Sequence, residues 1–134
     1  MTVRGYETDT QGHLNQSVYL QYTEHARWEY LKAAGIEQSD IVAKGVGPVT
    51  LEQTVRYKHE LRAGDETTVS CAFEWVPGRK VFFLRQEVRK TDGTLAAEVT
   101  GTGGMMDLRA RRLVADPRAA LRDLASDPKV LGLE

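Results

Sequence analysis

The residues best suited to chemistry lie in one polar stretch near the start of the chain. Residues 7–16 read Glu-Thr-Asp-Thr-Gln-Gly-His-Leu-Asn-Gln, which is too polar for a core element and is expected to be a loop. A carboxylate such as Asp9 can attack a carbonyl carbon directly, or it can take a proton from water as a general base. His13 is a candidate substrate contact or general acid, and its alternative role is to bond the loop backbone. Gly12 has no Cβ, which lets the loop approach a bound ligand closely.

This loop must be positioned by the element that follows it, which carries the strongest helical pattern in the chain. We expect a helix over residues 17–35, with Ser17 as its cap and Gly35 at its C-terminal end. Its apolar residues recur at spacings of three and four and form one stripe: Val18, Tyr22, Ala26, Tyr30 and Ala33. The first N–H groups of a helix have no acceptor inside it and favour negative charge. The start of this helix, near Gln16, can therefore stabilise an oxyanion.

A period of two replaces the helical period after Pro48, which predicts strands. Residues 36–48 are expected to form a loop, and residues 1–6 a short first strand. Turn signals then separate four long strands, the last over residues 95–107; the turns are Arg62–Asp65, Pro77–Gly78 and Thr91–Thr94. The last strand carries glycines, which predict close approach of a backbone or a ligand: Gly101, Gly103 and Gly104. One helix against an antiparallel meander predicts an α+β fold, in which a curved sheet buries the apolar stripe.

The loop and the start of the helix together resemble a known family. The quoted residues are Tyr6-Glu7-Thr8-Asp9-Thr10-Gln11-Gly12-His13-Leu14-Asn15, followed by Tyr19, Tyr22, Glu24, Ala26 and Arg27. They are similar to the pattern D-T-D-x-x-G-H-V-N-N, then Y-x-x-Y and E-x-A-R, of the 4-hydroxybenzoyl-CoA thioesterase family of hotdog proteins. Two positions depart from it: Glu7 replaces the common Asp, and Gln16 stands where relatives often carry Asn, His or Tyr.

The resemblance implies a hotdog fold, with one long helix wrapped by a curved antiparallel sheet, and homodimers or homotetramers that join sheets edge to edge. It implies an acyl thioesterase acting on an acyl-CoA or acyl-carrier-protein thioester, with active sites at the dimer interface. Asp9 would be the nucleophile or general base, and the helix N-terminus near Gln16 the oxyanion hole. Gly12 would bring the loop backbone close to the acyl group.

Other residues have both a functional and a structural interpretation. Glu24 is a second candidate catalytic carboxylate, or it pairs with Arg27 one turn later. Asn15 and Tyr19 are candidate substrate contacts, although Asn15 is also suited to fixing the loop and Tyr19 to the core. The resemblance places Arg79 and Lys80 where some relatives hold CoA phosphates, and a solvated turn is the alternative. His59 and Cys71 are expected to be packing residues rather than a catalytic pair.

Composition limits the remaining classes. The chain has 134 residues and a formal net charge of −1, which suits one domain and disfavours a general nucleic-acid binder. One cysteine, no metal-binding spacing and no long apolar stretch predict a cytoplasmic protein without a metal, another cofactor or a membrane partner. Residues 1–134 are expected to form a single hotdog domain. Residues 111–134 would be a C-terminal extension, with a short helix over residues 117–125 capped by Asp116.

Two other functions fit the same residues. A hotdog acyl dehydratase would use a histidine and a carboxylate, which His13 and Glu24 imitate. A non-catalytic acyl-CoA binding module would use the same pocket without Asp9 chemistry. The sequence does not identify the acyl group, nor does it choose between CoA and a carrier protein, between nucleophile and general base, or between dimer and tetramer. Two basic patches, at Arg79-Lys80 and Arg109–Arg112, suit either CoA or an acidic carrier protein.

Overall fold

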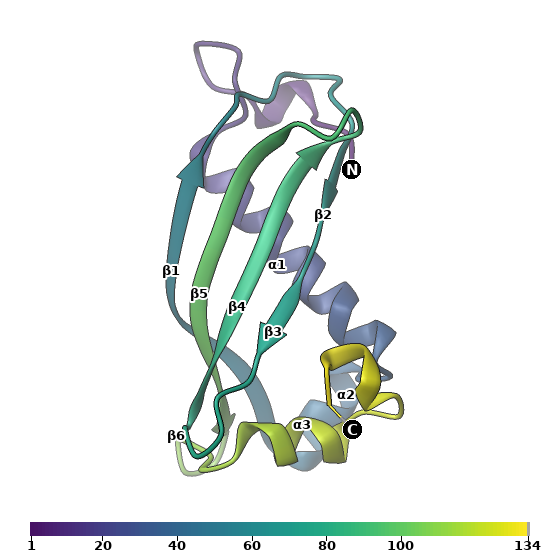
Figure 1. Cartoon of the computed structure of the whole chain (residues 1–134), viewed down its shortest axis with the longest axis vertical. Helices are drawn as coiled ribbons and strands as arrows, with labels where there is room; N and C mark the ends of the chain where they lie inside the picture. Colours follow the sequence, from purple (N-terminus) through teal and green to yellow (C-terminus); the bar gives the residue numbers. More distant parts are fainter. Residues whose placement is uncertain (134) are drawn as a thin grey trace.

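The computed structural model describes residues 1–133 and shows a long helix lying across one curved antiparallel sheet (Figure 1). The helix, α1, spans Gln16–Ala33. The sheet has the order β1-β5-β4-β2, with β3 also on β4 and β6 on β5. The strands are β1 (Val46–Tyr57), β2 (Thr67–Val69), β3 (Ala72–Glu74), β4 (Val81–Lys90), β5 (Leu95–Asp107) and β6 (Arg112–Leu113). The expected hotdog arrangement is therefore confirmed.

The helix α1 starts one residue earlier than expected, and its cap is Asn15 rather than Ser17. Asn15 Oδ1 accepts a hydrogen bond from the Ser17 N–H at 3.1 Å, which satisfies one of the free donors of the first turn. The helix ends at Ala33, and Gly35 follows with a φ of +84°. A Cβ at Gly35 would overlap the side chain of Ser126, so glycine is required there for space as well as for backbone conformation.

Two predictions for the loops around α1 are wrong. Residues 1–6 do not form a strand, because Gly5–Glu7 turn into a short 3-10 helix, η1, and Thr2 makes only an isolated bridge to Glu66. The segment expected as a loop contains a helix, α2, over Gln38–Lys44. The Glu37 N–H donates to Asp40 Oδ2 at 2.8 Å and closes its first turn, while Gly45 ends it with a φ of +70°.

The sheet is not the simple meander expected from the order of its strands. β1 pairs along its length with β5, the last long strand, and not with β2. Residues 58–66 carry the chain over one end of the sheet, so β1 and β2 lie at opposite edges (Figure 1). Leu61, fully buried, anchors this crossing. The outer edge of β1 has no neighbouring strand in the described residues.

The glycines of β5 lie where the sequence predicted close approach. A Cβ at Gly101 would overlap the carbonyl oxygen of Glu52 on β1. The ladder between β1 and β5 shifts register at this place, between Thr50 and Glu52, and leaves Leu51 outside it. Leu51 is 49% exposed, so the alternation of β1 is interrupted there rather than continuous.

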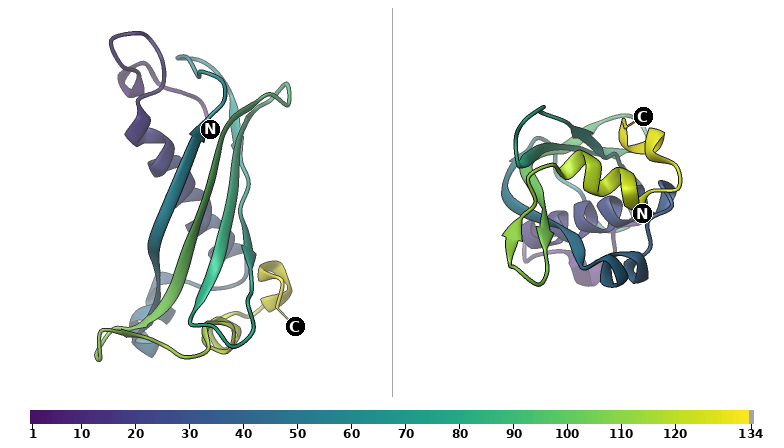
Figure 2. Two further views of the ribbon diagram at one scale, coloured as in Figure 1. Left: turned by 60° about the vertical axis from the view of Figure 1, so that its left-hand side comes forward. Right: turned by 90° about the horizontal axis from the view of Figure 1, so that it is seen from below.

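The C-terminal segment covers the lower end of the sheet and helix (Figures 1 and 2). Asp116 caps α3, which spans Pro117–Leu124, and thereby confirms the expected short helix. A 3-10 helix, η2, follows at Pro128–Leu131. Within residues 1–133, none of the helices has the length and apolar character needed to cross a membrane.

Candidate functional site

Asp9 sits in a tight loop that its own carboxylate helps to close. The Asp9 N–H donates to the His13 carbonyl at 2.8 Å, and the Gly12 N–H donates to the Asp9 carbonyl at 3.0 Å. Asp9 Oδ1 accepts from the Gln11 N–H at 2.9 Å and from the His13 N–H at 3.2 Å. Oδ2 has no donor among the described residues. One carboxylate oxygen is therefore fixed by backbone, while the other is free to react.

Gly12 and His13 shape this loop in different ways. Gly12 has a φ of +79°, a backbone conformation that favours glycine. His13 Nε2 lies 2.5 Å from Glu60 Oε2. The Arg62 guanidinium donates to Glu60 Oε1 and lowers the pKa of that carboxyl. The His13 ring is thus held by Glu60, whereas the His13 backbone holds Asp9.

Glu7 is a buried carboxylate that supports the loop. In the sequence it stood out only as a departure from the family pattern. Glu7 is 8% exposed, and its Oε1 accepts from the Tyr22 hydroxyl at 2.7 Å and from the Arg4 N–H at 2.9 Å. The Arg4 guanidinium lies 3.6 Å from the other oxygen. Burial, followed by the hydrogen bond to Glu7, raises the pKa of Tyr22. The Glu7 side chain thereby connects the loop to α1.

The start of α1 faces the same side as the loop. The Gln16 N–H has no acceptor among the described residues, since Asn15 bonds the next N–H instead. Tyr57 Oη donates to the Gln16 carbonyl at 3.5 Å. The Tyr57 ring packs edge-on against Tyr19, with centroids 5.1 Å apart. Burial, and then the nearby Tyr57, raises the pKa of Tyr19 to about 12.

These residues enclose a groove of about 320 Å³ between the loop, α1 and the end of β1. Its lining residues are Asp9, Gln11, His13, Leu14, Gln16, Tyr19, Tyr57, Lys58, His59 and Glu60. Four candidates named from the sequence meet here: Asp9, His13, Gln16 and Tyr19. The sequence reading missed the segment from Tyr57 to Glu60, and the prediction that His59 packs in the core is wrong, because it is exposed. The signal that could have identified this segment is the run of polar residues Lys58-His59-Glu60 directly after a strand.

Glu24 does not join this groove within one chain. It lies eight residues along α1 from Gln16, which is about 12 Å at 1.5 Å per residue. There it lines a separate hollow of about 360 Å³ together with Arg27 and Gln53. Arg27 donates to Gln86 Oε1 at 3.1 Å, and burial lowers the pKa of its guanidinium.

Arg79 and Lys80 lie even farther from Asp9 in the same chain. They occupy the turn between β3 and β4, at the end of the sheet opposite the Asp9 loop (Figure 1). The ten residues of β4 alone separate the two ends by about 33 Å. The second basic patch, Arg109–Arg112, lies in the turn between β5 and β6 and at the start of β6, at the same lower end. Contact between either patch and a carrier bound at Asp9 would therefore need a second subunit.

Comparisons with known proteins agree with this architecture. Residues 3–124 match the thioesterase-like superfamily. The long-chain acyl-CoA thioesterase FadM of Escherichia coli is 25% identical over 117 residues, which cover 84% of this chain and 85% of that protein. The chloroplastic acyl-acyl carrier protein thioesterase ATL3 of Arabidopsis thaliana is 30% identical over 83 residues, and the match spans 62% of this chain and only 44% of ATL3.

Solved structures show the same fold. A hypothetical protein from Aquifex aeolicus is 30% identical and superposes with a TM-score of 0.80, covering 92% of this chain and 95% of that one. YbaW, a probable thioesterase from Escherichia coli, superposes with a TM-score of 0.80 at 24% identity, covering 94% and 96% of the two chains. At that identity the second likeness concerns the fold alone.

Proposed function

The chain belongs to the thioesterase-like superfamily, and from that premise we propose that it hydrolyses an acyl-CoA or acyl-carrier-protein thioester to a free acid and a thiol. The observation that carries the proposal is the Asp9 carboxylate, which keeps one oxygen without a donor among the described residues and lines the same groove as Gln16, the first residue of α1. A reactive oxygen and an oxyanion donor are the two groups that acyl transfer requires.

The reaction has two forms with this geometry. As a nucleophile, Asp9 Oδ2 attacks the thioester carbon, the C–S bond breaks, and water then hydrolyses the acyl anhydride. As a general base, Asp9 takes a proton from water while the water oxygen attacks the same carbon and the thiolate leaves. In both forms the Gln16 N–H stabilises the negative oxygen, a contribution typically of about 3 kcal/mol to the barrier. The leaving thiolate takes up one proton in each case.

We also propose that the functional unit is at least a homodimer joined through β1. The outer edge of β1 is unpaired in the described residues, and unpaired edges invite pairing. Large apolar side chains are exposed on both elements: Leu51 and Tyr57 on β1, and Leu20 and Trp28 on α1. Antiparallel pairing about a two-fold axis reverses the direction of the partner sheet. The partner's Arg79 and Lys80 would then approach the Asp9 end of this chain, where the carrier is expected.

One assay tests both the activity and the identity of the carrier, CoA or an acyl carrier protein. FadM is named for acyl-CoA and ATL3 for acyl-carrier-protein substrates, and the basic turns at the lower end of the sheet suit both. Free-thiol release is measured against aryl, short-chain and long-chain acyl-CoAs, and then against acyl carrier proteins. The substrate hydrolysed with the highest kcat/KM identifies the carrier and the acyl class.

The same assay, run on Asp9→Asn, tests the catalytic assignment. Loss of a general base or nucleophile should lower kcat by about 10²–10⁴-fold. Asp123→Asn is the matched control, because Asp123 is an exposed carboxylate on α3, far along the chain from the groove. An Asp9→Asn variant that retains wild-type kcat would refute the role of Asp9.

A further inference from the structure

The hollow beside Glu24 has an open side and a closed side. Its exposed lining residues, Glu24, Trp28 and Thr50, come from α1 and β1 and mark the opening. Its most buried side chains are apolar and mark the closed end: Leu31, Phe73, Phe82 and Leu84. The half-buried Arg27 and Gln53 also line the hollow. Polar groups at the opening and apolar groups at the end are the distribution expected where an acyl chain enters tail first. We call this hollow the acyl bay.

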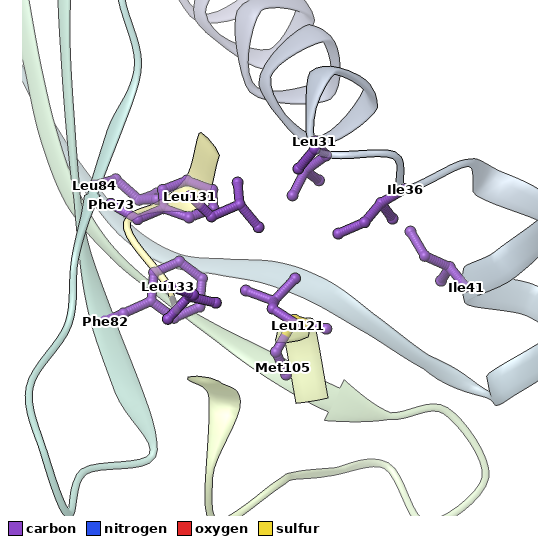
Figure 3. Packing of buried hydrophobic residues seen from close by; sticks show 11 residues of the cluster. Leu31, Ile36, Ile41, Phe73, Phe82, Leu84, Met105, Leu121, Leu131 and Leu133 are labelled. Carbon is purple, nitrogen blue, oxygen red and sulfur yellow. The ribbon is translucent and has the colours of Figure 1, made fainter. Parts of the chain in front are cut away.

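The closed end of the acyl bay is backed by the C-terminal segment. Leu121, Leu131 and Leu133 are at most 1% exposed. They belong to the same core cluster as the four closed-end residues (Figure 3). Phe73 and Phe82 pack with their ring centroids 4.9 Å apart and form the aromatic part of this wall. Leu121, Leu131 and Leu133 therefore pack in the core cluster to which the closed end of the bay belongs.

Hydrogen bonds and a close contact attach this segment to the rest of the fold at several points. The Trp75 indole N–H donates to the Leu131 carbonyl at 2.8 Å. The Asp127 N–H donates to the Ala34 carbonyl at 2.9 Å, at the end of α1. Ser126 lies so close to Gly35 that no side chain fits between them. A wall held by backbone hydrogen bonds on both sides keeps a fixed depth.

We propose that residues 126–133 form the floor of the acyl bay and set the longest acyl group that the enzyme accepts. The proposal rests on the proposed thioesterase function and on the proposed dimer, because the bay and the Asp9 groove share no lining residue within one chain, and it deepens that function. From Glu24 to Leu31 the bay follows seven residues of α1, or about 10 Å. Its volume of about 360 Å³ lies near the lower end of ligand pockets, which span about 300–1,000 Å³. The substrate class is therefore a medium-length or aryl apolar acyl thioester, and long unbranched chains are excluded by the floor.

Two substitutions are expected to change the preference for acyl length in opposite directions. Leu131→Ala removes part of it and should raise the ratio of kcat/KM for a long acyl thioester over that for a short one by about tenfold or more, since one methylene in an apolar pocket is typically worth about 10–200-fold. Val49→Phe, on the β1 wall of the bay, should lower the same ratio. Val88→Ala is the control, because Val88 is fully buried in the other core cluster and should change stability without changing the ratio.

A binding measurement separates this inference from the proposed function. The melting temperatures of wild type and both variants are measured with saturated fatty acids from butyric to stearic acid. The Leu131→Ala protein should be stabilised by longer acids than wild type, and the Val49→Phe protein only by shorter ones. If wild type hydrolyses no thioester but these shifts appear, the proposed function fails and the floor stands. If hydrolysis is intact and both variants keep the wild-type length profile in both assays, the floor is refuted. Should Leu131→Ala fail to fold, the milder Leu131→Val takes its place, because Val49→Phe narrows the β1 wall of the bay and leaves the floor unchanged.

Discussion

At the scale of single residues, the Asp9 loop depends on groups that carry no chemistry themselves. Glu7 connects the loop to α1 through Tyr22 and receives the Arg4 N–H, all in a nearly dry position. Hydrogen bonds to a buried charged group are stronger than neutral ones, and leaving such a site half-satisfied is costly. The orientation of Asp9 is therefore expected to depend on Glu7, although the two side chains do not touch in the described contacts.

Glu7→Gln tests this dependence. The substitution keeps the shape of the side chain but removes its charge, so the free energy of unfolding should fall by about 1–3 kcal/mol. The proposed hydrolysis should weaken as well, because the loop that holds Asp9 loosens. Urea denaturation measures the first effect and kcat the second. Glu29→Gln, on an exposed part of α1, should change neither. Unchanged stability in Glu7→Gln would show that the buried carboxylate is dispensable.

The sequence identified most of the groove at this scale but not its far wall. Asp9, His13 and Gln16 are close together along the chain, so a local pattern was sufficient to group them. Tyr57, at the end of β1, and His59, just after it, reach the groove only because the end of β1 packs beside the start of α1, a long-range contact with no local signature. Glu24 was grouped with Asp9 because the two residues are close in the sequence. In the structure, the rise along α1 separates the two carboxylates.

At the scale of elements, the bulge in β1 depends on a glycine in the facing strand. Gly101→Ala would place a Cβ against the Glu52 carbonyl oxygen, where backbone and not a flexible side chain must move. Overpacking of this kind typically costs about 1–3 kcal/mol, and thermal unfolding should show the loss. Gly5→Ala is the control, because a Cβ there meets no atom within 4 Å. Equal melting temperatures for the two variants would contradict the requirement for glycine at the bulge.

Periodic elements were predictable, and the exceptions have physical causes. The sequence predicted β5 at its observed bounds because an Asp-Gly turn precedes it and its pattern is long. The helix α2 was not predicted, because seven residues are too few to show the helical periodicity, although its capping residues were present. The order of the strands was not predicted, because the alternation within a strand does not specify which other strand it pairs with. Here β1 pairs with β5.

At the scale of the whole molecule, the face formed by β1 and α1 looks incomplete. The outer edge of β1 has no neighbour among the described residues, and Trp28, Leu51 and Tyr57 are exposed on α1 and β1. Trp28 lines the acyl bay, and Tyr57 lines the groove. Apolar surface of this kind is usually covered in a soluble protein. A second copy, paired through its own β1, would cover it on both chains at once, because a two-fold interface uses the same patch twice.

Leu51→Asp should therefore convert the proposed dimer to monomers, since it places a charge at the centre of the β1 edge, where each copy would oppose the other. The molar mass measured by light scattering during gel filtration should fall to that of one chain, and hydrolysis should fall with it if the carrier contacts come from the partner. Val42→Asp is the matched control, because Val42 is also apolar and 71% exposed but belongs to α2 rather than to the strand that would pair. A wild-type protein that is monomeric and fully active at the assay concentration would refute the dimer. In that case the carrier must be bound by residues near Asp9 in the same chain, among which Lys58 is the exposed cation of the groove lining.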